Sequence, residues 1–165
     1  MNMDPKELII NKVKEKFSSA VEEVSEFAGD LSITITKEKI LELSNFLKND
    51  PELEFLMCKD VTAVDWAVRK NRFTTVYHVH SFKLNFTLRI KVNLGEDASV
   101  ESVVPVWRSA EWYERETFDM YGIKFLNHPD LRRMYMPEGF EHHPLRKDFP
   151  LLGIPGSLPL PKKAE

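Results

Sequence analysis

The sequence predicts an α+β fold: a two-layer domain in which helices cover one face of a mostly antiparallel sheet. An extended proline-rich C-terminal tail follows this domain. Three observations predict it: two helical periodicities within the first 50 residues, alternating strands between residues 55 and 93, and a concentration of prolines near the C-terminus. Seven of the ten prolines lie after Gly122. We therefore expect residues 1–122 to form the α+β domain, ending in a helix, and residues 123–165 to form an extended interaction tail.

The first half of the chain predicts two helices and two strands. The first helix covers residues 1–17, with Asp4 as its N-cap, Pro5 at its first position and Glu7 in a capping-box position. A weakly patterned strand over residues 20–27 and an alternating strand over residues 31–36 follow. Thr36 is expected to cap a second helix, which ends at the Asn-Asp-Pro segment 49–51.

The middle of the chain predicts strands over residues 55–68, 73–82 and 86–93, where β-branched and aromatic residues alternate with polar ones. Because the links between these strands are short, we expect an antiparallel meander. Residues 96–102 are polar and predict a loop, and residues 103–107 lead into the next helix.

The helix that ends the domain is unusual. Ser109 is expected to be its N-cap and Gly122 to end it. Between them no single apolar stripe appears, so the helix requires cover on several sides, with charged groups among those covered. The tail beyond Gly122 is rich in both proline and large apolar residues. Proline excludes a long helix or a central strand there, so we expect the tail to be buried against a partner.

The whole sequence sets limits on function. The length fits one domain, and a net charge of −3 argues against a nucleic-acid partner. Cys58 is the one cysteine in the sequence, which excludes an internal disulfide, a four-cysteine zinc site and a cysteine-ligated iron–sulfur cluster within this chain. No apolar run approaches the roughly 20 residues that span a bilayer, so we expect no direct membrane insertion.

Two segments carry a family resemblance. The first reads W-x-E-R-E-x-F-D-M-Y-G-I-x-F-x-x-H-P-D-L-R-R from Trp112 to Arg133, and the second reads H-P-L-R-K-D-F-P from His143 to Pro150. They resemble the C-type, thirty-kilodalton subunit of NADH–quinone oxidoreductase (respiratory complex I). The segments VTAVDWAV, RFTTVYHVHSF and VPVWRSAEW look like the same family, so the resemblance covers about the last two thirds of the chain. His142 departs from it, because the family pattern has glycine there.

The resemblance implies a non-catalytic subunit of the peripheral arm, docked on the large hydrogenase-like subunit that forms the quinone pocket. It implies neighbouring iron–sulfur subunits as further partners and a place on the cytoplasmic side of the cell membrane, held through those partners. It implies no cofactor in this chain, while NADH, FMN, iron–sulfur clusters and quinone are bound by other subunits. The alternative within the superfamily is the equivalent subunit of a membrane-bound hydrogenase or formate hydrogenlyase.

The expected partner interface consists of the charged and aromatic residues of the two motifs: Trp112, Glu114, Arg115, Glu116, Asp119, His128, Arg132, Arg133, His143, Arg146, Lys147 and Asp148. Among them, Arg115 and Asp119 are expected to pair as i,i+4 neighbours, and the later bases to pair with motif acids or with a partner's acids.

Two catalytic alternatives stay open at this point. His78 and His80 lie two apart on one strand face and, with His128, His142 and His143, could form a metal site in a stand-alone metalloenzyme. The i,i+3 acids Glu116 and Asp119 could act as a general acid and base. We expect neither, because the resemblance implies no metal and no nucleophile stands near the acids.

Overall fold

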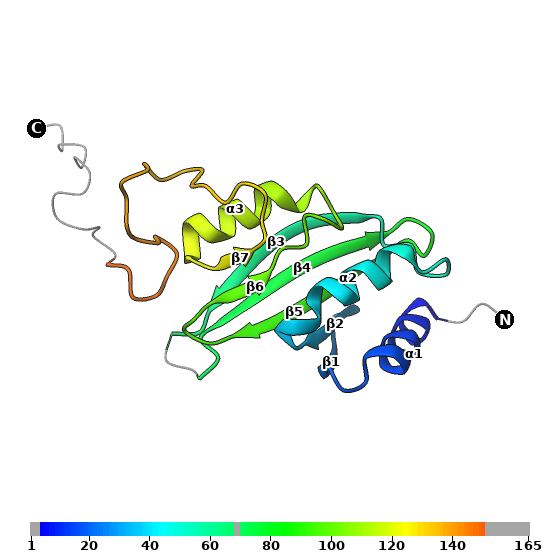
Figure 1. The fold of residues 1–165 in the computed structure, drawn as a ribbon. Coiled ribbons are helices and arrows are strands. Elements are labelled where there is room, and N and C mark those ends of the chain that lie inside the picture. The colour runs from blue at the N-terminus through cyan, green and yellow to red at the C-terminus, as the bar shows by residue number, and fades with distance from the viewer. Residues whose placement is uncertain (1–3, 68–69, 151–165) are drawn as a thin grey trace, which may run out of the picture.

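The computed structural model describes residues 4–67 and 70–150. It shows a five-stranded sheet in the order β1-β2-β5-β4-β3 and a two-stranded sheet formed by β6 and β7. Figure 1 shows α2 lying across the large sheet, α1 near its β1 end and α3 beside β3. In chain order the elements are α1 (Pro5–Phe17), β1 (Val21–Phe27), β2 (Asp30–Ile35), the 3-10 turn η1 (Lys37–Lys39), α2 (Ile40–Asn49), β3 (Met57–Asp65), β4 (Phe73–Ser81), β5 (Phe86–Leu94), β6 (Ser99–Glu101), α3 (Ala110–Tyr121) and β7 (Lys124–Leu126).

The predicted α+β class is confirmed. Strands β3, β4 and β5 form the expected antiparallel meander, β1 pairs with β2 in antiparallel fashion, and β2 joins β5 through a parallel pairing. Residues 1–3 of the predicted first helix, residue 68 of the predicted third strand and residues 151–165 of the predicted tail lie outside the described residues.

One face of the large sheet forms the core. Alternate residues of the central strands, such as Tyr77 and Ile90, are fully buried and belong to a single apolar cluster with Ile9 of α1 and Leu43 of α2. The residues between them point to the opposite face, as the period of two requires. That second face carries polar and charged side chains, including His78 and Arg89.

The sequence predicts the N-terminal cap of α1 correctly but not that of α2. Asp4 caps α1 as expected, since its side chain accepts the Lys6 N–H at 3.0 Å. The prediction that Thr36 caps α2 is wrong, because the intervening turn η1 separates the two. Thr36 precedes η1 without a side-chain cap, its carbonyl accepts the Lys39 N–H at 3.1 Å, and α2 begins only at Ile40.

The prediction of a loop over residues 96–102 is also wrong in part, because Ser99–Glu101 form β6, which pairs in parallel with β7. Three residues are too few to show an alternation, and the partner strand lies more than 20 residues further along. Val100 and Phe125 at the centres of the two strands are each 2% exposed. The division of the chain at Gly122 stays a prediction, although the burial of Phe125 argues that the packed unit continues through β7.

Within the described ranges, no helix is both long and apolar enough to cross a membrane.

Candidate functional site

Helix α3 lies along β3, the last strand of the large sheet, and supplies donors to its carbonyl groups. The Ser109 hydroxyl donates to the Cys58 carbonyl at 2.9 Å, and the Thr117 hydroxyl lies 2.9 Å from the Val61 carbonyl and 2.8 Å from the Tyr113 carbonyl of its own helix. The Ser109 bond satisfies a carbonyl that an additional strand would otherwise pair with, so the segment that begins α3 helps to protect the sheet edge. Ser109 stands at the N-cap position as predicted, but its side chain does not cap the helix, because its backbone is already helical, with φ −63° and ψ −22°, and its hydroxyl binds the strand.

Gly122 ends α3 as predicted. Its φ is +75°, in the left-handed region that glycine adopts at low cost, and its N–H donates to the Phe118 carbonyl at 2.8 Å. A second reason for glycine is the imidazole of His143, because a Cβ added at Gly122 would lie 2.6 Å from two atoms of that ring. The His143 Nδ1 lies 2.9 Å from the Asp119 carbonyl oxygen, to which it donates.

Residues 127–150, which we call the strap, run back over α3 (Figure 1). Asp119 holds the middle of the strap. Its carboxylate accepts the backbone N–H groups of Met134, Tyr135 and Met136 at 3.0, 2.7 and 3.0 Å and pairs with Arg133 at 2.6 Å. Burial by itself would raise the pKa of Asp119, but the three amides and Arg133 outweigh it and lower the pKa below its usual range.

Arg115, which lies one turn before Asp119 on α3, also binds the strap. Its guanidinium donates to the carbonyls of Arg132 and Arg133 at 3.2 and 3.4 Å and lies over the Trp112 ring, 5.0 Å from the ring centre. The predicted i,i+4 pair between Arg115 and Asp119 is therefore wrong. The helix does place the two side chains near one another, but each is used by backbone groups of the strap.

Glu114 is buried on the inner side of α3. It accepts the Ser102 hydroxyl at 2.6 Å and the Val103 N–H at 2.8 Å, and so connects the helix to the segment after β6. Burial raises its pKa to about 7, against the opposing effect of these two donors. The ring of His128 lies 3.9 Å away. Because His128 Nδ1 accepts the Asp130 N–H and Nε2 faces the Glu111 carbonyl, the ring carries its proton on Nε2.

A second carboxylate, Asp65 at the end of β3, holds the far end of the strap. It accepts two bonds from Arg72, each 3.1 Å long, and the Lys147 N–H at 2.8 Å. Arg72 also pairs with Asp148 at 2.8 Å. Burial alone would raise the pKa of Asp65, but Arg72 and the backbone donors lower it to about 2. Sequence reasoning gave Asp65 and Arg72 no role, although both lie in segments that resemble the family.

The expected interface residues thus divide into two groups. Inward-facing side chains bind the chain's own strap or core: Glu114, Arg115, Asp119, His128, Arg133 and His143. The others lie at least partly exposed on α3 and the strap: Trp112, Glu116, Arg132, Arg146, Lys147 and Asp148. Tyr135 and Leu145 of the strap, which are 60% and 50% exposed, are among the large apolar tail residues that we expect a partner to bury. A partner interface for these residues stays a prediction.

The histidines that could have formed a metal site lie apart. His78 points to the polar face of the sheet, where its Nδ1 and Nε2 contact Asp60 and Arg89 at 2.8 and 2.9 Å. His128 and His143, by contrast, contact α3. Among residues 4–67 and 70–150, no three His, Cys, Asp or Glu side chains are grouped in a way that could hold a metal ion.

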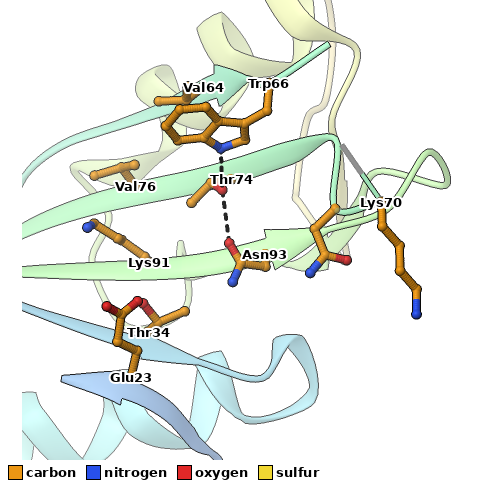
Figure 2. Close-up of a pocket in the computed structure, with 10 residues that line it drawn as sticks. Glu23, Thr34, Val64, Trp66, Lys70, Thr74, Val76, Lys91 and Asn93 are labelled. Atoms are coloured by element: carbon orange, nitrogen blue, oxygen red, sulfur yellow. Dashed lines mark hydrogen bonds between the residues drawn. The ribbon is translucent and has the colours of Figure 1, made fainter. Parts of the chain in front are cut away.

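The polar face of the large sheet also contains a hollow of about 440 Å³ (Figure 2). Trp66 donates through Nε1 to the Thr74 hydroxyl at 2.9 Å, and that hydroxyl lies 2.9 Å from the Asn93 side-chain oxygen. Lys91 of β5 and Glu23 of β1 also line the hollow. The central polar groups of the hollow, those of Trp66, Thr74 and Asn93, thus bind one another.

Comparison with known proteins first defines the class. The fold matches a chain of an archaeal respiratory membrane complex, the membrane-bound sulfane sulfur reductase, with a TM-score of 0.73 and 27% identity over 88% of this chain and 86% of that one. It also matches the trypsin-resistant fragment of Nqo5, with a TM-score of 0.65 and 24% identity over 77% of this chain and 99% of the fragment. The chain therefore shares the α+β architecture of a respiratory-complex subunit.

The sequence then gives the particular family. Residues 33–154 match the family described as the respiratory-chain NADH dehydrogenase, 30 Kd subunit, and the chain belongs to this family. A C-type subunit of NADH-quinone oxidoreductase from Rhizobium meliloti (strain 1021) is 49% identical over 142 residues, which is 86% of this chain and 78% of that protein. The corresponding protein of Brucella ovis is 44% identical over 86% of this chain and 70% of its own length. The resemblance inferred from the two motifs is confirmed.

Proposed function

We propose that this chain is a non-catalytic subunit of the peripheral arm of proton-translocating NADH:quinone oxidoreductase. In this proposal it docks on the large hydrogenase-like subunit that forms the quinone pocket, next to iron–sulfur subunits, and supports electron transfer from NADH to quinone. Family membership and the names of the relatives support the choice of complex. In this proposal the chain lies on the cytoplasmic side of the cell membrane, where partner subunits hold it.

The exposure of large side chains on α3 and the strap is the observation that supports this location of the docking surface. Trp112 and Tyr135 are each 60% exposed and Leu145 is 50% exposed, and Arg132 of the strap, which pairs with Asp130, is also exposed. Exposed aromatic residues with arginine are typical of the central part of protein interfaces. Because Asp119 and Asp65 already hold the strap in place, docking does not have to order it, which lowers the entropic cost of binding.

Cofactors are proposed to be bound by other subunits alone. NADH, FMN, iron–sulfur clusters and quinone all require sites that this chain does not supply in the proposal. The thiol of Cys58, which is the natural cluster ligand, is fully buried, and burial raises its pKa to about 12. Since a cluster binds the thiolate, this cysteine is a poor ligand in the folded chain.

A second candidate is the equivalent subunit of a related membrane-bound complex, such as a membrane-bound hydrogenase or formate hydrogenlyase. The specific observation in its favour is the match to the archaeal sulfane sulfur reductase, which has a TM-score of 0.73 at 27% identity. The same fold therefore occurs in a respiratory complex whose name includes no NADH–quinone activity.

Purification of the complex containing Trp112→Ala tests the proposal. We expect a lower yield of assembled complex on native gels and a matching loss of NADH:quinone activity, because a central aromatic anchor is removed. Phe27→Ala is the control, since Phe27 is 82% exposed on β1, at the opposite edge of the sheet. Hydrogen evolution without NADH:quinone activity in the wild-type complex would instead favour the second candidate.

A further inference from the structure

The last turn of the strap lines a small open cavity whose role the family assignment does not explain. Its volume is about 380 Å³, and Arg146, His142, His143 and Phe149 are among the residues that line it. All of its lining residues belong to the strap, and the consecutive residues Lys147 and Asp148, which bind Asp65 and Arg72, hold this turn beside the end of β3.

Arg146 is held firmly at this cavity yet has an unused donor. Its guanidinium lies over the Phe73 ring, 5.0 Å from the ring centre, and its backbone N–H donates to the His143 carbonyl at 3.1 Å. The Nε atom is buried and has no hydrogen-bond partner within the described part of the chain. A buried arginine donor without an acceptor is costly, so a native structure that retains one has a reason to keep it.

The neighbouring acids do not meet this need. Asp148 pairs with Arg72 at 2.8 Å, and Asp65 accepts two bonds from Arg72 and one from the Lys147 N–H. Glu141 also lines the cavity, but it is exposed and forms no ion pair with the described residues. The two nearby carboxylates, Asp65 and Asp148, therefore both bind Arg72, and Arg146 forms no ion pair with the described residues.

His143 is not a competing cation at this cavity. Its Nδ1 donates to the Asp119 carbonyl, and its pKa is lowered, first by burial and then by the positive charges of Arg133 and Arg146. The permanent positive charge that lines the cavity is therefore that of Arg146.

We propose that the cavity accepts a carboxylate side chain, Asp or Glu, from the partner subunit, and that the guanidinium of Arg146, which lines the cavity, binds it through its terminal N–H groups. This rests on the proposed docking of the α3 and strap surface. The planar fork of arginine matches the two oxygens of a carboxylate, and the Phe73 ring fixes the plane of the fork before the partner arrives. Arg146 thus recognises the partner, while Asp119 and Asp65 keep the strap in place.

The test measures two properties of Arg146→Met, which keeps the apolar stem over Phe73 and removes the donors. The first is the melting temperature of the free full-length chain, which should stay the same or rise, because an unpaired buried donor is lost. The second is the affinity for the purified large hydrogenase-like subunit, which should fall about thirtyfold or more, because the partner's carboxylate is left unpaired at the interface. Arg146→Lys should give an intermediate loss, since it keeps the charge without the fork.

Three further variants make the result specific. Lys124→Met removes an exposed charge on β7 outside the strap and should change the affinity by less than about threefold. Glu141→Gln should leave the affinity unchanged or raise it, because it removes an acid that competes for Arg146. Trp112→Ala reports on the docking surface itself.

The outcomes separate the two proposals. If Arg146→Met binds as tightly as Lys124→Met while Trp112→Ala binds weakly, the carboxylate site is wrong and the docking surface stands. If Arg146→Met lowers the melting temperature of the free chain and leaves the affinity unchanged, the acceptor belongs to the chain itself and the inference is overturned. If the wild-type chain does not bind the large subunit, the proposed function is wrong as well.

Discussion

The carboxylate of Asp119 and the guanidinium of Arg133 meet at 2.6 Å, although 14 residues separate them and one belongs to α3 and the other to the strap. Three successive backbone N–H groups, those of Met134, Tyr135 and Met136, converge on the same carboxylate. Such a run of amides forms an anion-binding site, and here the anion is part of the same chain. The strap therefore keeps its path over α3 without a partner.

The first prediction concerns this carboxylate. Asp119→Ala should destabilise the chain by about 3 kcal/mol, because Arg133 and three amides lose a buried acceptor together. Urea unfolding measures the loss, and amide hydrogen exchange at residues 134–136 should speed up. Glu116→Ala on the same helix is the control and should change stability by less than about 1 kcal/mol. Unchanged exchange at residues 134–136 in Asp119→Ala would show that other contacts hold the strap.

The second prediction concerns pH and Glu114. Its pKa is about 7 in the folded chain against an ordinary value of 4.5. An acid whose pKa is raised by folding binds its proton more tightly in the folded state, so stability falls as pH rises from about 4.5 to about 7. The fall amounts to as much as about 3 kcal/mol. Denaturant unfolding from pH 4 to 8 measures it.

Glu114→Gln should remove this part of the pH dependence, because the amide does not titrate in that range. An equal fall in the Gln variant would assign the pH dependence to another group.

The third prediction separates two reasons for glycine at the end of α3. Gly29→Ala tests backbone strain alone, because Gly29 has φ +91° and open space around it. It should cost about 1 kcal/mol. Gly122→Ala adds the contact with the His143 ring to a similar strain and should cost roughly twice as much or more. Melting curves of both variants decide the question, and equal costs would show that the ring moves away freely.

The fourth prediction concerns the sheet edge. Thr117→Val keeps the shape of the side chain but removes the hydroxyl that lies within hydrogen-bond distance of both the Val61 and the Tyr113 carbonyls, which should cost about 1–2 kcal/mol. Thr62→Val is the matched control, because Thr62 is exposed on the polar face of the same strand. Equal stability of the two variants would mean that α3 packs on β3 without help from this hydroxyl.

Much of the fold could be predicted because its periodicities are local. Phe86–Leu94 alternate along one strand, and Asp4 and Gly122 mark helix ends with residue types suited to those positions. The strands β6 and β7 could not be predicted this way. Each has three residues, and their pairing depends on a parallel contact between distant segments.

The site was predicted in its residues but not in its contacts. The motifs selected Arg115, Asp119 and Arg133, but a helical wheel shows only neighbours on α3. It contains no information about the strap backbone, which supplies the carbonyls for Arg115 and the amides for Asp119. The sequence predicts that the apolar residues of the tail need cover, but which of them stay exposed on the chain itself, as Tyr135 and Leu145 do, depends on how the strap is held.

The central claim is that α3 and the strap face the large hydrogenase-like subunit in the assembled complex. The most direct measurement places a photoreactive residue at Tyr135 or, for comparison, at Phe27, irradiates the intact complex and identifies the cross-linked chain by mass spectrometry. The account predicts that the probe at Tyr135 joins this chain to the large subunit and that the probe at Phe27 does not. Cross-linking to the large subunit from Phe27 and not from Tyr135 would contradict it.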